Sequence, residues 1–297
     1  MAACGGATEE AADVIDAVTD KAGFSVGLIK SGAGEKVALR LPSEVGLEQT
    51  LRTTLSQRIK FKVNGATQTA EISSSQSNTL RITAVEGDEI VVQSTLDSME
   101  ADLGGGPSSA EFGEALADAM IGSVSTQRWT DRGAIISADL PTVDVDVPAG
   151  LGVSSQEFND LMHQLMTSME DSAQSMGVPT PVEPVAVGSS WMATAELSMV
   201  GMPMKISTTV TVTDIADDRV IGNIDQTLTM IPGDAEIQGQ KLTIDGGQID
   251  CDGSIAYLRE GGIAPLIEMD CDGSNEMRTN GVTVKQELHM KQSTKSG

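Results

Sequence analysis

Four aspartates in the C-terminal quarter are the residues whose type and spacing most favour chemistry. They form two pairs, each flanking a cysteine: Asp250 and Asp252, then Asp270 and Asp272. Gly261 and Gly262 lie midway between the pairs and are typical of a hairpin turn, which would set the pairs opposite each other. Facing carboxylates repel, and a divalent cation held by oxygen ligands relieves the repulsion. Calcium is therefore a candidate ligand, and the alternative is a hydrated acidic face screened by salt.

The same hairpin places Cys251 opposite Cys271. In this register one face of the strand pair is apolar and the other is polar, as a half-buried antiparallel sheet requires, and a shift of one residue destroys the sorting. We therefore predict a cross-strand disulfide, which is typical of an oxidising compartment and so of an exported protein. The alternative is two buried thiols in a cytosolic protein.

Catalytic motifs are absent from the sequence. It contains no Gly-x-Ser-x-Gly, no complete dinucleotide-binding glycine motif and no phosphate-binding loop. Neither His163 nor His289 has a second ligand at zinc spacing, so each is expected to be an ordinary solvated or hydrogen-bonded histidine. A second acidic pair, Asp144 and Asp146, is a lesser candidate for a cation or for acid–base work. We expect no enzymatic activity.

Methionine is unusually abundant, with 15 residues against two tryptophans and one tyrosine. Helical spacing aligns one group on a predicted long helix, 156–176; its members are Leu161, Met162, Leu165, Met166 and Met169. Methionine is flexible and fills irregular apolar space. The stripe therefore predicts either part of an aromatic-poor core or the wall of an apolar pocket that holds a lipid-like ligand.

The elements that must position these residues are mainly strands. Alternating apolar and polar residues and several glycine turns, among them Asn64-Gly65, predict antiparallel hairpins. Similar patterns at 50–96 and 191–230 suggest an α+β fold of two similar curved sheets with one or two helices packed on them. The expected organisation is a disordered tether at 1–13, a β-rich half at 14–150 with a helix at 110–124, a long helix and linker at 151–188, and a second β-rich half at 189–297.

Composition excludes several classes of partner. The formal net charge of −24 repels nucleic acid and anionic lipid surfaces, and aromatic residues, at 2%, are too few for stacking on bases or sugars. The sequence holds no run of 18 apolar residues, so we expect no membrane-spanning helix.

The first residues, Met1-Ala2-Ala3-Cys4-Gly5-Gly6, resemble the end of a lipoprotein signal peptide followed by a polar tether. With the two strand-rich halves, the chain looks like a bacterial cell-envelope lipoprotein, and its architecture over about 35–291 is similar to that of periplasmic lipid-binding carriers. The resemblance implies that Cys4 is the lipid acceptor and that the protein is exported to the periplasm or outer surface, touching the membrane only through this anchor.

Two functions remain open at this stage, and a third, a hydrolase, has the least support. The first is a non-enzymatic lipoprotein that binds or carries a lipid-like ligand between sheet and helix. The second is a structural or interaction protein of the envelope whose acidic surface meets a partner or calcium. A true cavity favours the first, and a tightly filled interior favours the second.

Overall fold

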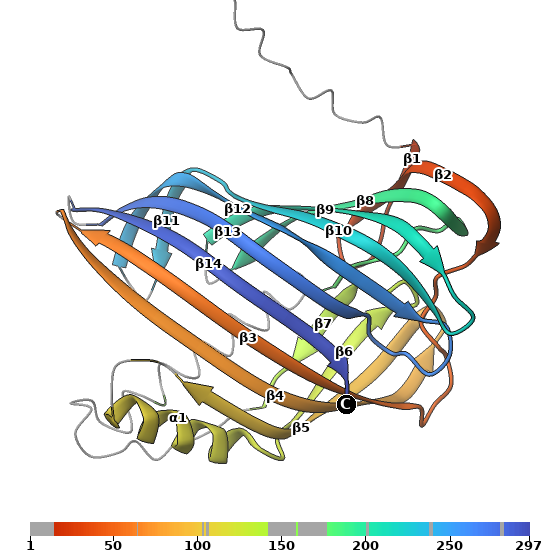
Figure 1. The fold of residues 1–297 in the computed structure, drawn as a ribbon, viewed down its shortest axis with the longest axis horizontal. Coiled ribbons are helices and arrows are strands. Elements are labelled where there is room, and N and C mark those ends of the chain that lie inside the picture. Colours follow the sequence, from red (N-terminus) through yellow and green to blue (C-terminus); the bar gives the residue numbers. More distant parts are fainter. Residues whose placement is uncertain are drawn as a thin grey trace, which may run out of the picture.

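The computed structural model describes residues 15–63, 65–102, 104, 107–141, 159, 177–199, 202–237, 240–279 and 282–297. These residues form one 14-stranded sheet, in which the paired strands are antiparallel (Figure 1). Its strands are β1 (Ile15–Thr19), β2 (Ser25–Val37), β3 (Glu48–Val63), β4 (Ala66–Glu86), β5 (Glu89–Asp102), β6 (Val124–Thr130), β7 (Ile135–Asp139), β8 (Val185–Met199), β9 (Met202–Ile215), β10 (Arg219–Met230), β11 (Gly233–Ile237), β12 (Gln240–Leu258), β13 (Leu266–Thr279) and β14 (Val282–Ser296).

The prediction of two similar sheets with packed helices is wrong. The strand order is β1-β2-β8-β9-β10-β12-β13-β14-β3-β4-β5-β6-β7, with β11 paired to β12. The chain runs from β2 to β3 through 38–47, and the whole of β8–β14 lies between these two strands in space. Pairing of β14 with β3, from Val284↔Val63 to Ser296↔Leu51, covers two edges that separate sheets would leave exposed.

The strands arise from alternation, as β3 shows. Leu51, Leu55 and Ile59 point to one face and are buried or half-buried, whereas the intervening residues, such as Arg58 and Lys60, are exposed. We call the face that carries Leu51 and Trp191 the core face and the opposite one the polar face. Turns predicted from glycine are confirmed: Gly87, at a φ of 71°, closes the hairpin in which Glu86 pairs with Glu89.

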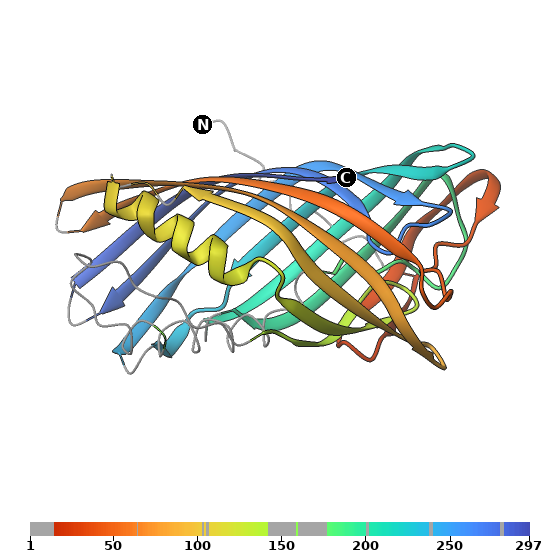
Figure 2. The same cartoon turned by 90° about the horizontal axis from the view of Figure 1, so that it is seen from below.

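One helix, α1 (Pro107–Met120), follows β5 and matches the helix predicted at 110–124. It runs beside β5, where that strand extends beyond its pairing with β6 (Figure 2). Gly113 permits this approach, because a Cβ at that position would collide with the carbonyl oxygen of Ala101. The helix therefore covers an otherwise open stretch of sheet edge.

At one end the sheet curls, so that the turn between β1 and β2 meets the turn between β4 and β5. We call this region, built from the turns and crossing segments at 20–24, 38–41, 86–89, 130–134 and 178–181, the closed end. Lys21 Nζ lies 2.8 Å from Asp88 Oδ1, Leu41 N donates to Asp131 O at 2.8 Å, and Thr180 N donates to Arg132 O at 2.9 Å. These contacts tie the β1–β2 turn and the crossing segments to the β4–β5 and β6–β7 turns.

Two buried clusters fill the interior near the closed end. The first gathers Val26, Trp191, Val210 and Ile224 from the β2–β10 side, and the second gathers Ile82, Val92 and Trp129 from the β4–β6 side. The strands continue well beyond these clusters, and β4 alone has 21 residues, about 70 Å at 3.3 Å each. We call the far portions of β3, β4, β12, β13 and β14, residues 55–74, 242–251 and 271–290, the open half (Figure 1).

Candidate functional site

Apolar side chains continue along the core face of the open half. Strands β3, β4, β13 and β14 contribute Leu55, Ile59, Phe61, Val63, Ile72, Met277, Leu288 and Met290. Each is half-buried, and each lies outside the buried clusters described above. The strand alternation that buries Leu51 therefore also places apolar side chains farther along the same face, with polar side chains such as Gln57 and Gln286 among them.

Methionine is concentrated on the core face of the whole sheet. Seven methionines of the described sheet lie on it: Met99, Met202, Met204, Met230, Met269, Met277 and Met290. Met204 and Met230 form a small buried cluster with Ile244 at the far end. The predicted stripe Leu161, Met162, Leu165, Met166 and Met169 lies outside the described residues. Searching for methionine at a spacing of two, as well as at helical spacing, would have found the sheet-borne group.

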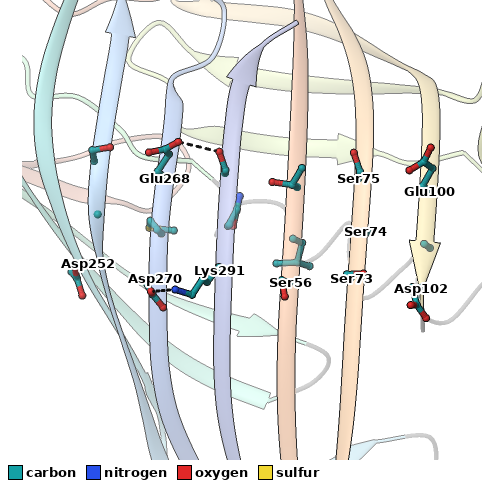
Figure 3. A pocket seen from close by; sticks show the side chains of 18 residues that line it. Ser56, Ser73, Ser74, Ser75, Glu100, Asp102, Asp252, Glu268, Asp270 and Lys291 are labelled. Carbon is teal, nitrogen blue, oxygen red and sulfur yellow. Dashed lines mark hydrogen bonds and ion pairs between the residues drawn. The ribbon is translucent and has the colours of Figure 1, made fainter. Parts of the chain in front are cut away.

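The polar face carries a hollow of about 860 Å³ that crosses six neighbouring strands (Figure 3). Three consecutive residues from each of β12, β13, β14, β3, β4 and β5 line it. Its carboxylates stand at the two sides: Glu100 and Asp102 on β5, and Asp252, Glu268 and Asp270 on β12 and β13. Hydroxyls on the strands between them belong to Thr54, Ser56, Ser73, Ser75 and Ser293, and Ser254 lies on β12 with Asp252.

Two lysines partly neutralise the hollow. Lys291 Nζ lies 2.8 Å from Asp270 Oδ2, and Lys295 Nζ lies 2.9 Å from Glu268 Oε1. Hydrogen bonding to Lys291 lowers the pKa of Asp270, and hydrogen bonding to Lys295 lowers the pKa of Glu268. Both carboxyls are therefore ionised at neutral pH, which does not suit them to act as general acids.

The aspartate register predicted from the sequence is confirmed: Asp252 pairs with Asp270, and Asp250 with Asp272. Asp250, however, accepts a hydrogen bond from Thr227 Oγ1 at 2.9 Å, so its position is set by the neighbouring strand. The ligand atoms that converge belong to Asp270, Asp272 and His289, which all lie within 4.8 Å of one another.

His289 forms a hydrogen bond, as expected, but its convergence with the aspartates was not predicted because these partners are on another strand. It is opposite Asp272 in the β13–β14 register, and its Nδ1 lies 2.9 Å from Asp272 Oδ1 and 3.6 Å from Asp270 Oδ1. A set of two carboxylates and one imidazole suits zinc or a similar transition metal better than calcium, which prefers oxygen ligands alone.

The predicted disulfide between Cys251 and Cys271 is present, and both cysteines are buried on the core face. Cys4, Asp144, Asp146 and His163 lie outside the described residues. Within the described part of the chain, no helix is both long and apolar enough to cross a membrane.

Comparisons with known proteins do not assign the chain to a family. No protein-family model and no curated protein matches the chain. Solved structures with some likeness include OmpF of Salmonella typhi in complex with daunomycin, at 6% identity and a TM-score of 0.27 over 86% of this chain and all of that one. A mutant porin of Rh. blastica scores 0.22 at 9% identity, covering 82% of this chain and 99% of that one.

An outer membrane channel of Pseudomonas putida F1 gives a TM-score of 0.23 at 6% identity, over 89% of this chain and all of that one. Values this low do not establish a common fold, so these likenesses to porins and channels carry no argument about function here.

Proposed function

We propose that this chain is an exported, non-enzymatic protein that binds an extended apolar ligand, such as the acyl chain of a lipid, along the core face of the open half. The observation that carries the proposal is the group of half-buried apolar side chains there, which lie on the same face as the core but outside its buried clusters. The disulfide supports export. Anchoring through Cys4 remains part of the proposal.

The dimensions suit a lipid chain. From Leu55 to Val63, β3 extends about 26 Å at 3.3 Å per residue. The hydrocarbon core of a bilayer is about 30 Å thick for two leaflets, so one acyl chain needs about 15 Å. Each buried methylene contributes about 0.8 kcal/mol, which gives a long chain enough binding energy without any polar contact.

The chemistry of the surface also suits a variable ligand. Methionine adapts to irregular shapes, and the core face of the open half carries Met277 and Met290 beside Phe61 and aliphatic side chains. A site for sugars or nucleobases needs aromatic platforms, which this sequence largely lacks.

The first experiment compares native and denaturing mass spectrometry of the protein after mild purification. We expect an additional mass, identified as lipid, that is lost on denaturation. The purified protein should also bind a fluorescent C16 fatty acid. A bare polypeptide mass together with no binding of the fatty acid would refute the proposal.

Adjacent residues on β3 provide a matched pair of variants. Phe61→Glu places a charge on the core face and should weaken binding of the C16 probe at least tenfold, whereas Lys60→Glu changes the polar face and should leave binding intact. Equal effects of the two substitutions would place the ligand elsewhere.

The acidic hollow supports a second candidate function, a surface protein that binds cations or a basic partner. It rests on the five lining carboxylates and on the convergence of Asp270, Asp272 and His289. Calcium or zinc binding that persists in Phe61→Glu would support this function independently of the lipid proposal.

A further inference from the structure

A pocket of about 250 Å³ lies at the closed end, away from the open half. The segment 37–41, the β6–β7 turn, the crossing segment at 178–180 and the β12–β13 connection enclose it. Its walls are mainly apolar, and three arginines line it: Arg40, Arg132 and Arg259. We call it the arginine pocket.

The charge of the arginine pocket is opposite to that of the chain. No aspartate or glutamate is among its lining residues, although the protein has 43 acidic residues and only 19 basic ones. A cationic, apolar-walled pocket in a chain of net charge −24 favours a ligand that is itself anionic and partly apolar.

Arg132 is a buried cation whose side chain has unused hydrogen-bond donors among the described residues. It is only 9% exposed, and among the described residues its side chain makes one long hydrogen bond, from Nη1 to Thr180 O at 3.5 Å. The fully buried side-chain atoms without a partner in the described part are Asp20 Oδ2, Asp270 Oδ1 and Asn275 Oδ1. The remaining guanidinium nitrogens of Arg132 are not among these atoms. They are therefore not fully buried, and they border accessible space.

Arg40 is already committed to the protein, whereas Arg259 is exposed to solvent. The Arg40 guanidinium donates to Leu39 O, Pro181 O and Val182 O at 2.7–2.9 Å and lies 3.3 Å from Asp131 Oδ2. Arg259 Nη1 donates to Ala216 O at 3.2 Å. Both side chains raise the positive potential of the arginine pocket, but Arg132 is the buried arginine of the three and is the one we assign to a bidentate contact.

The position of Arg132 is fixed by its turn. Thr130 Oγ1 accepts hydrogen bonds from Arg132 N at 3.3 Å and Ala134 N at 3.1 Å. Thr180 N donates a hydrogen bond to Arg132 O at 2.9 Å. A guanidinium mounted on a rigid turn loses little conformational entropy on binding, which favours recognition of a planar anion.

Asp20 limits the charge of the ligand. Burial raises the pKa of Asp20, and the attraction of Arg132 partly opposes this rise. The two side chains form no direct ion pair among the described contacts. One arginine with a carboxylate nearby balances a ligand of one negative charge better than a ligand of two negative charges.

We propose that the arginine pocket binds a small monoanionic organic acid, with its carboxylate on Arg132 and its apolar body against Leu39, Leu41 and Val178. The volume equals roughly eight waters at about 30 Å³ each, which matches a short acid such as hexanoate. This site is separate from the surface proposed for acyl chains.

Calorimetric titration of the full-length protein with hexanoate tests the proposal. We expect saturable binding, and Arg132→Gln should weaken it about 10- to 100-fold, the effect of losing a charged hydrogen-bonding partner. Arg58→Gln, at an exposed arginine on the polar face, is the matched control and should bind as the wild type does. Hexanol, which lacks the charge, should bind far more weakly than hexanoate.

Side-chain NMR covers the case in which Arg132→Gln fails to fold. Hexanoate should shift the Arg132 Nε–Hε resonance of the wild-type protein. Absence of binding, an unshifted resonance, unchanged affinity in a folded Arg132→Gln variant, or equal competition by inorganic phosphate would each overturn the proposal. Phe61→Glu should retain hexanoate binding, so failure of the acyl-chain proposal is distinguishable.

Discussion

At the closed end, Ile82, Val92 and Trp191 are fully buried, whereas on the core face of the open half Leu55, Ile59 and Phe61 are only half-buried. All of these residues lie on strands with the same alternating pattern. The difference comes from the segments at 38–41, 130–134 and 178–181, which cross and tie the closed end. Alternation decides which face of a strand is apolar, and the crossing segments decide how deeply that face is buried.

The largest expected effect is at Trp191, which is 0% exposed and donates from Nε1 to Pro179 O at 3.1 Å. Trp191→Ala should lower the free energy of unfolding by about 3–5 kcal/mol. Phe61→Ala in the open half should lower it by only about 1 kcal/mol, because less apolar area is removed from water. Urea unfolding measures both, and equal losses would show that the two regions are packed alike.

The next effect comes from the disulfide, which joins β12 to β13 at the edge of the open half. Replacing both Cys251 and Cys271 by Ala should lower the free energy of unfolding by about 3 kcal/mol, the chain-entropy cost of a loop of about 20 residues. Hydrogen exchange should increase first in 242–251 and 271–279. Increased exchange confined to the closed end would contradict this assignment.

A smaller effect is a dependence of stability on pH, which should come from Asp20 at the closed end. Burial raises the pKa of Asp20 above its usual 3.8. A carboxyl with a raised pKa holds its proton more tightly in the folded state, so its contribution to stability is present below pH 3.8 and is lost as pH rises through the folded pKa. The stability difference between wild type and Asp20→Asn, measured by urea unfolding from pH 3 to 7, should change with this sign.

The smallest effect is expected on the polar face. Zinc should bind weakly at Asp270, Asp272 and His289, and His289→Ala should reduce that binding, because one of three converging ligands is lost. Calcium should bind more weakly still and respond little to the substitution. Calorimetry with each metal separates the cases, and calcium binding stronger than zinc binding would restore the all-carboxylate hypothesis.

Local features of the fold could be predicted from the sequence. The β12–β13 register follows from Gly261, the cysteines and the sorting of apolar residues onto one face, and each of these lies within about 20 residues of the others. The same logic places the turns near Gly65 and Gly87. Short-range patterns carry this information because a slip of one residue would expose a whole apolar face.

Long-range pairing could not be predicted in the same way. Nothing in the local pattern of β14 indicates that it pairs with β3, more than 200 residues earlier in the chain. The convergence of His289 with Asp270 and Asp272 could not be predicted for a related reason, since Asp272 is adjacent only after β13 and β14 pair. The arginine pocket likewise depends on segments far apart in sequence, so Arg40, Arg132 and Arg259 give no recognisable motif.

The position of β14 also determines the order in which the molecule can be assembled. During synthesis, β3–β7 emerges early, but the edge of β3 has no partner until residues 282–296 have left the ribosome. The chain must therefore keep a long strand edge from pairing with other molecules while the rest of the sheet is made. Pairings of such wide sequence separation also slow folding, so a newly made chain should depend on holding factors until its final strand arrives.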